Sequence, residues 1–204
     1  VTLSAAGSYA WFRDTLGDLE TYQEEQGKGD AYYLLDQLAK QSSPGANGVI
    51  FTPYLTGERC PLFDANATGC FVGLTAHSTK GDMARAVLEG VALSLRHVYE
   101  LMLSVGSDLD PEEMIIAGGG AKSPLWRQIM ADVFGMPVKT VYGSAEGGAF
   151  GAAMVAGAGA GVWANLNEAM RVAKPEQETT PSGAKPIYDE TYAKYVQLHE
   201  RLQF

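Results

Sequence analysis

A run of β-branched residues leads through three consecutive glycines into a helix start in the segment IIAGGGAKSPLWRQ, residues 115–128. Ser123 is the expected N-cap, Pro124 occupies the first helical position, where no N–H is needed, and Gly135 is the expected helix end. Such glycines let a backbone approach a ligand closely, often a phosphate or a nucleotide at a helix N-terminus. A tight turn without any ligand explains them as well. The segment therefore predicts a strand, a turn and a helix, and leaves open whether the turn holds a ligand.

Two well-known phosphate-binding motifs do not fit this segment. The dinucleotide fingerprint G-x-G-x-x-G would start at Gly118, but it requires a glycine where Ser123 stands and an acidic residue roughly 20 positions further on, and the stretch VKTVYG contains none. A P-loop anchored on Lys122 and Ser123 would need glycines at Ile116 and Ala121. A Rossmann dehydrogenase and a P-loop NTPase are therefore both disfavoured.

Strand patterns and helix patterns alternate along the chain, which predicts an α/β fold with a mainly parallel sheet. Thr79 and Asp82 form a capping-box start for the clearest helix, and Ile115–Ala117 is expected to be a buried strand that leads into the glycine turn. A polar linker is expected over residues 174–186. The expected strands are 48–55, 70–74, 115–117 and 137–142, and the expected helices end near 17 or span 30–41, 79–102, 123–134, 144–158 and 186–204.

Composition and charge limit the class of protein. The chain has 204 residues, of which 46% are hydrophobic, so it is long and apolar enough to form a core in one domain or two small ones. A net charge of −9 argues against binding to nucleic acid or to an anionic membrane surface. No run reaches the ~18–20 apolar residues of a membrane span. The small residues of the nearest run, 147–166, are expected to pack closely in a soluble core.

The two cysteines, Cys60 and Cys70, lie ten positions apart without a CxxC motif or a histidine at ligand spacing, so no zinc site is indicated. A disulfide between them is one alternative, and a reduced protein in the cytoplasm is the one we favour. The chain starts at Val1 and has no features of a signal peptide, so it is expected to be a piece of a longer protein.

Several chemically capable residues are expected to be structural. Glu58 and Arg59 lie in a loop with a proline and are expected to shape that loop. His77, His97 and His199 have no carboxylate or cysteine at a catalytic or metal-binding spacing along the sequence. The three tryptophans, at positions 11, 126 and 163, are expected to belong to the core.

Five longer stretches resemble the FGGY family of carbohydrate kinases, in the order in which that family has them. They are VTLSAAGSYAWFRD, PYLTGERCP, GCFVGLTAHSTKGDMARAVLEGVA, GGGAKSPLWRQIMADVFGMPV and EGGAFGAAMVA. Within the family, the residues of these stretches are most similar to those of the xylulokinases. The resemblance runs over essentially the whole chain. It implies the C-terminal, ATP-side lobe of a two-lobe sugar kinase, over residues 1–204, with a ribonuclease H-like (actin-like ATPase) fold that lacks its first strands.

The resemblance also implies a nucleotide site. Gly118–Ala121 matches the family's adenosine motif, whose backbone packs against the nucleotide. Pro124 stands where glycerol kinases have a nucleotide-contacting asparagine, and Ala6 and Ala10 match a glycine and a glutamine that face the nucleotide there, so less polar contacts are expected. The segment at Glu146 and Gly147 is expected to pack beneath the adenosine loop. The residues expected to bind ATP are Gly118, Gly119, Gly120, Ala121, Ser123, Pro124, Ala6 and Ala10.

The implied reaction transfers the γ-phosphoryl group of ATP to a hydroxyl of a ketose such as D-xylulose, giving D-xylulose 5-phosphate. In the family, the sugar, the catalytic aspartate and most Mg²⁺ ligands belong to the other lobe or to the hinge. No aspartate of this chain has a glycine two positions later, as the D-x-G-[TS] phosphate-binding turn of this fold class requires. We therefore expect no catalytic residue and no metal ligand in this chain, and no activity from residues 1–204 alone.

Two alternatives stay open at this point. Because the residues that read the sugar are expected outside this chain, a glycerol, gluconate, ribulose or fuculose kinase fits the same motifs. A non-catalytic, actin-like interaction module is the alternative from another functional class. Whether the whole enzyme is a homodimer also stays open.

Overall fold

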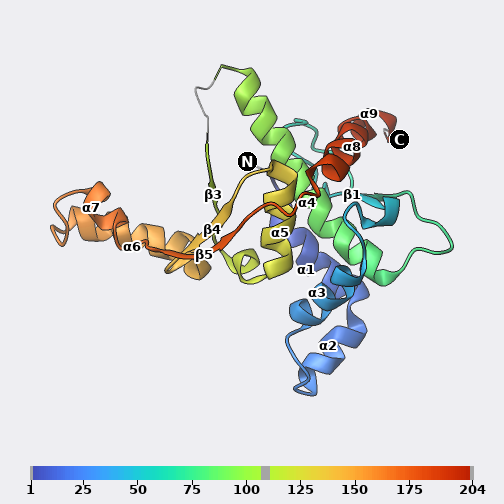
Figure 1. Cartoon of the computed structure of the whole chain (residues 1–204), viewed down its shortest axis with the longest axis horizontal. Coiled ribbons are helices and arrows are strands. Elements are labelled where there is room, and N and C mark those ends of the chain that lie inside the picture. Colours follow the sequence, from blue (N-terminus) through green and yellow to red (C-terminus); the bar gives the residue numbers. More distant parts are fainter. Residues whose placement is uncertain (1, 107–110, 203–204) are drawn as a thin grey trace. The chain divides into compact units, whose positions relative to one another are not determined.

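The computed structural model describes residues 2–106 and 111–202, and the chain forms two compact units. The first unit comprises Val1–Asp110 with Gly183–Phe204, and the second comprises Pro111–Ser182. Helices and strands occur in both, as the alternating sequence patterns predicted (Figure 1). The first unit contains α1 (Ala5–Leu16), α2 (Asp18–Glu25), α3 (Ala31–Gln41), η1 (Ala46–Gly48), β1 (Ile50–Thr52), β2 (Cys70–Val72), α4 (Lys80–Ser104), α8 (Lys185–Tyr195) and α9 (Leu198–Arg201). The second contains β3 (Met114–Ile115), η2 (Gly119–Lys122), α5 (Pro124–Phe134), β4 (Val138–Val141), η3 (Ser144–Glu146), α6 (Gly148–Gly159), α7 (Leu166–Met170) and β5 (Pro175–Thr179).

Helix α4 forms the centre of the first unit. The capping box expected at its start is confirmed, because the Thr79 hydroxyl accepts a hydrogen bond from the Asp82 N–H at 3.1 Å and the Asp82 carboxylate accepts one from the Thr79 N–H at 2.8 Å. Burial alone would raise the pKa of Asp82, but hydrogen bonds from Ser42, Thr79 and Asn47 outweigh it and lower the pKa to about 2. The start of α4 is therefore fixed by an ionised, fully paired carboxylate.

The first half of α4 is buried on every side, because α1, α3 and β1 all pack against it. Val87 and Val91 belong to this buried half, whereas Met102 near the other end is 46% exposed. Gly90 brings α4 directly against the backbone of β1, where an added Cβ would overlap the Phe51 carbonyl oxygen. The first unit is thus built around a close contact between a helix and a strand.

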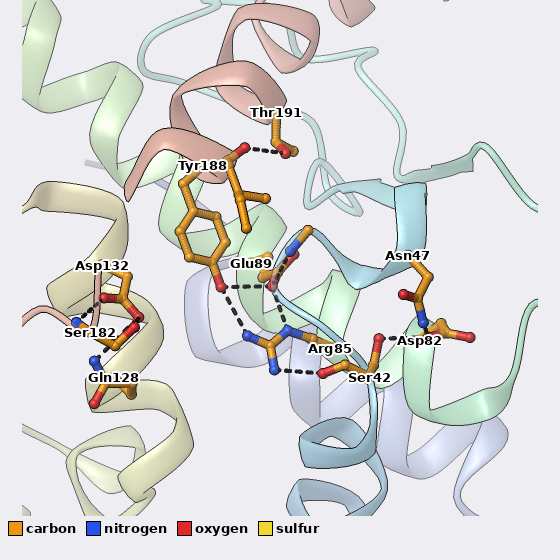
Figure 2. A network of polar contacts seen from close by, with 12 residues as sticks. Ser42, Asn47, Asp82, Arg85, Glu89, Gln128, Asp132, Ser182, Tyr188 and Thr191 are labelled. Carbon is orange, nitrogen blue, oxygen red and sulfur yellow. Dashed lines mark hydrogen bonds and ion pairs between the residues drawn. The ribbon is translucent and has the colours of Figure 1, made fainter. Parts of the chain in front are cut away.

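A polar network is enclosed in this unit. The carboxylate oxygen Oε1 of Glu89 accepts hydrogen bonds from Arg85 Nε at 2.6 Å, from the Tyr188 hydroxyl at 2.8 Å and from the Gly45 N–H at 3.1 Å (Figure 2). Arg85 also donates through Nη2 to the Tyr188 hydroxyl at 3.0 Å and through Nη1 to the Ser42 carbonyl at 3.0 Å. The network ties α8 to α4, although the two helices lie about a hundred residues apart in the sequence.

The sheets differ from the mainly parallel sheet that was predicted. In the first unit, β1 and β2 pair antiparallel. In the second unit the strand order is β3-β4-β5, with β3 parallel and β5 antiparallel to β4. The prediction of a mainly parallel sheet is therefore wrong for the described residues. Strand β5 lies in the segment that the sequence predicts to be a polar linker. This prediction missed the strand because its charged, exposed residues have no strand periodicity and pair through their backbone.

The strand expected at Ile115–Ala117 is shorter and less buried than predicted. Strand β3 covers Met114–Ile115, Ile115 is 59% exposed, and Ile116, just after the strand, is buried. The reason is that β3 lies at the edge of the sheet and, among the strands of the described residues, pairs with β4 alone.

Helix α6 does not pack into a core, in contrast to the expectation for its small residues. None of its residues is buried, and Val155 is 60% exposed. Its main contact is with the segment that follows, where Trp163 lies so close to Gly157 that no Cβ would fit. Trp163 therefore does not belong to a core as expected, but packs against α6 from the segment between α6 and α7. These two helices lie together in Figure 1.

The closing helix is divided into α8 and α9, and Tyr188, Tyr192 and Tyr195 form its buried stripe. Both cysteine thiols, Cys60 and Cys70, are free. Within residues 2–106 and 111–202, every helix is too short or too polar to span a bilayer.

Candidate functional site

The three glycines form a turn that is held by backbone hydrogen bonds. Gly118 has φ +85° and ψ −174°, a conformation that glycine adopts far more easily than other residues. Its N–H donates to the Ser144 carbonyl at 2.6 Å, and its carbonyl accepts from the Ala121 N–H at 3.0 Å. The chain then makes the short turn η2 and enters α5.

The start of α5 is as predicted. The Ser123 hydroxyl accepts a hydrogen bond from the Trp126 N–H at 3.0 Å, Pro124 occupies the first helical turn, and Gly135 ends the helix in the left-handed conformation with φ +70°. The first N–H groups of a helix have no partner within it, and they carry the positive end of the helix dipole. The glycine turn therefore lies next to a helix end that favours an anion.

The fold restricts two of the three glycines, Gly118 through its backbone conformation and Gly120, less strongly, through a contact with a side chain. Gly118 needs its positive φ, and a Cβ on Gly120 would lie 3.4 Å from the Trp126 indole nitrogen. Gly119 has neither restriction: its φ lies outside the positive range, and an added Cβ would find no atom of the described residues within 4 Å. The backbone at Gly119 is therefore the part of the turn that a ligand could approach.

Arg127 is the residue at this site that the sequence did not single out. Its guanidinium Nη1 donates to the Ala121 carbonyl at 2.5 Å, and the residue is only 8% exposed. The available signal was an arginine between Leu125 and Ile129, which are both buried in α5. That signal shows only that a cation interrupts an apolar helix face, whereas its partner depends on the fold of the turn.

The segment after β4 packs against the glycine turn, as expected for the stretch at Glu146 and Gly147. Besides the hydrogen bond from Gly118 to Ser144, a Cβ added to Gly147 would lie 3.5 Å from the Gly118 nitrogen. Gly147 has φ +46°, which favours glycine. This contact joins residues about thirty positions apart.

The structure brings six of the eight predicted nucleotide-binding residues together in the second unit. They are Gly118, Gly119, Gly120, Ala121, Ser123 and Pro124. The other two, Ala6 and Ala10, lie on α1 in the first unit, where Ala6 is exposed and Ala10 is half-buried. Their expected role in nucleotide binding stays a prediction.

Glu58 shapes its loop, as predicted. The side chain is buried, and its Oε1 accepts hydrogen bonds from the Arg59 N–H at 2.7 Å and the Leu3 N–H at 3.1 Å. The backbone of Glu58 also pairs with that of Asp64 in both directions, at 2.8 and 2.9 Å. The carboxylate therefore closes the loop on itself and on the start of the chain.

Two histidines have structural surroundings that sequence spacing could not reveal. Burial lowers the pKa of His97, although the charge of Glu100 opposes this shift. His199 Nε2 lies 3.6 Å from Asp64 Oδ2, so this histidine has a carboxylate neighbour 135 positions away in the sequence. Only the fold brings these two residues together.

Comparison with known proteins identifies the family. The sequence pattern of the FGGY family of carbohydrate kinases, C-terminal domain, matches residues 2–160. The chain belongs to this family. A xylulose kinase of Staphylococcus epidermidis is 34% identical over 203 residues, which cover 98% of this chain and 38% of that protein. A gluconokinase of Bacillus licheniformis is 40% identical over 124 residues, which cover 61% of this chain and 24% of that protein.

The fold is that of FGGY kinase C-terminal domains, an actin-like ATPase fold. The ligand-bound xylulose kinase from Lactobacillus acidophilus superposes with a TM-score of 0.81 at 28% sequence identity, covering 98% of this chain and 39% of that one. The chain thus spans about two-fifths of the length of these FGGY relatives. The resemblance read from the motifs is confirmed at the level of family and fold.

Proposed function

We propose that the full-length protein is an ATP-dependent carbohydrate kinase that transfers the γ-phosphoryl group of ATP to D-xylulose, and that residues 1–204 form its nucleotide-binding C-terminal domain. The observation that carries the proposal is the bare backbone of Gly119 beside the N-terminus of α5, in a chain of the FGGY family. A flat backbone suits the close approach of an adenosine, and a helix N-terminus suits a ribose or phosphate oxygen. The xylulose kinase match over 98% of the chain supports the choice of sugar.

In this proposal the nucleotide lies along the glycine turn, and Ser123 and Pro124 hold the start of α5 behind it. Ala6 and Ala10 contribute apolar contacts from α1. The sugar, the catalytic aspartate and most Mg²⁺ ligands are contributed by the N-terminal lobe. The reaction takes place in the cytoplasm. The Mg²⁺ ion would neutralise charge on the β- and γ-phosphates during transfer.

A gluconate kinase is the second candidate, because the gluconokinase match has the higher identity, 40%, although over a shorter stretch. The deciding experiment is a coupled assay of ADP release by the full-length protein with D-xylulose, gluconate, glycerol, ribulose and fuculose. We expect turnover with D-xylulose to exceed that with each other substrate at least tenfold. Preference for another of these sugars would correct the substrate, and no turnover with any of them would favour the non-catalytic actin-like module.

The Gly119→Val variant of the full-length protein should raise the KM for ATP tenfold or more, which corresponds to ~1.4 kcal/mol of lost binding. The valine side chain would occupy the face of the turn that is left open by all residues the structure describes. The KM for the sugar should stay within twofold, because the other lobe binds the sugar. Steady-state kinetics at varied ATP would measure both values.

Lys122→Ala is the matched control, because Lys122 is exposed in the same turn and has no P-loop position; its KM for ATP should change less than twofold. Gly120→Val is less informative, since its side chain would also press on Trp126. If a stably folded Gly119→Val enzyme keeps its KM for ATP, the glycines serve the turn alone.

Residues 1–204 by themselves should show no ATP-dependent phosphorylation of D-xylulose above the rate without protein. Phosphoryl transfer depends on positioning and charge stabilisation that both lobes of the enzyme supply. The full-length protein, assayed at the same molar concentration, is the positive control. Measurable turnover by residues 1–204 would contradict the assignment of the catalytic aspartate to the other lobe.

A further inference from the structure

Hydrogen bonds hold the glycine turn at both of its ends. At its start, the Gly118 N–H donates to the Ser144 carbonyl at 2.6 Å. At its end, the Ala121 carbonyl accepts from Arg127 Nη1 at 2.5 Å. Between these two points lies Gly119, where an added Cβ would have no neighbour within 4 Å in residues 2–106 and 111–202.

Arg127 is an unusual residue for its place in the fold. It is only 8% exposed, and its Nε atom finds no hydrogen-bond partner among the residues that the structure describes. A buried cation with few partners is costly, and an apolar side chain such as leucine would suit the buried face of α5 better. The charge-assisted hydrogen bond to the Ala121 carbonyl offsets part of this cost and fixes the peptide plane at the end of the turn.

The guanidinium also adds to the electrostatics of the site. The N-terminus of α5 already carries a positive partial charge, and Arg127 lies in the second turn of the same helix. The buried positive charge of Arg127, which contacts the end of the turn, strengthens the attraction for an anionic ligand bound at the turn. The hydrogen bond of Arg127 to the turn and its positive charge therefore both favour binding of the same ligand.

We infer that Arg127 is a positioning residue for the nucleotide: through the Ala121 carbonyl it keeps the glycine turn in the form that leaves the Gly119 face open. The inference rests on the proposed nucleotide site. Arg127 does not touch the ligand in this account, so its loss should weaken nucleotide binding without changing how the sugar binds. A purely structural arginine would instead change stability and leave the KM for ATP as it is.

The test compares Arg127→Met, Arg127→Lys and Lys139→Met in the full-length protein. Methionine keeps the unbranched apolar stem and removes the donors, whereas lysine restores a charged donor. Lys139→Met removes a cation from β4 of the same unit, where the lysine pairs with Glu113 at 2.5 Å. We expect Arg127→Met to raise the KM for ATP at least fivefold, with the kcat at saturating ATP and the KM for sugar within twofold of the wild type.

Arg127→Lys should recover at least half of that loss on a logarithmic scale, and Lys139→Met should leave the KM for ATP within twofold. An Arg127→Met enzyme with an unchanged KM for ATP would overturn the inference. So would a variant whose KM for ATP and KM for sugar rise together, because that pattern indicates a general loss of structure.

Amide hydrogen exchange without nucleotide gives a second readout that needs no activity. We expect the amides of residues 119–122 to exchange at least fivefold faster in Arg127→Met than in the wild type, while those of residues 128–133 in α5 keep their rates. Equal rates at 119–122 would overturn the inference. If the wild-type protein neither binds ATP nor turns over sugar, the proposed function fails, and the exchange experiment still decides whether Arg127 holds the turn.

Discussion

Gly90→Ala should destabilise the first unit by at least about 3 kcal/mol and should prevent its folding at moderate temperature. In a helix interior, alanine is ordinarily more favourable than glycine by roughly 0.5–1 kcal/mol. At Gly90 this preference is outweighed, because the new methyl group would overlap the Phe51 carbonyl oxygen of β1. Neither partner can move easily, since both atoms belong to backbones at the centre of the unit.

Urea unfolding followed by circular dichroism would measure this change. Gly7→Ala is the matched control, because Gly7 is also inside a helix of the same unit, α1, and an added Cβ there meets no atom within 4 Å. Gly7→Ala should stabilise the chain by roughly 0.5–1 kcal/mol. A Gly90→Ala variant as stable as Gly7→Ala would contradict the close contact between α4 and β1.

Glu89→Gln should cost roughly 3–5 kcal/mol of folding free energy, because it leaves the buried Arg85 guanidinium without a counter-charge. Glu89 is 2% exposed, and its Oε1 is the shared acceptor of the network in Figure 2. Burial raises the pKa of Glu89, and the charge of Arg85 opposes this shift. Glutamine keeps the shape and one acceptor, so the loss reports on the charge.

Tyr188→Phe is the matched control for this network. It removes one hydroxyl, which donates to Glu89 and accepts from Arg85, but it leaves the ion pair intact. Its cost should be about 1–3 kcal/mol, and so smaller than that of Glu89→Gln. Equal costs for the two variants would show that the charge of Glu89 is not what stabilises the contact between α4 and α8.

Local signals in the sequence predicted the starts of α4 and α5 correctly. Ser123 and Thr79 each cap the helix that follows, because a cap is a hydrogen bond over two or three residues and depends little on the rest of the fold. Helix α2 was not predicted, since Gly17 was taken as an end, whereas the chain starts a new helix directly after it. One α2 residue, Glu20, is buried and paired with Lys80, a contact that no local pattern indicates.

The long motifs also determined the family, because they preserve several stretches in register over the whole chain. They did not determine strand pairing. Strand β5 has no alternating pattern, and its antiparallel position beside β4 depends on backbone hydrogen bonds between distant segments. The edge position of β3 likewise explains why Ile115 is exposed although it is β-branched and apolar.

By itself, the sequence determined the strand–glycine–helix unit, its caps and its family, because these depend on residue types at short spacing. Only the tertiary structure decided what each glycine does. Gly118 needs its positive φ, a Cβ on Gly120 would contact the Trp126 side chain, and Gly119 has neither restriction. The same holds for Arg127 and Ser144, whose contacts with the turn depend on where α5 and the segment after β4 lie in space. Three identical letters in a row carry no information about their neighbours across the fold, and those neighbours set their roles.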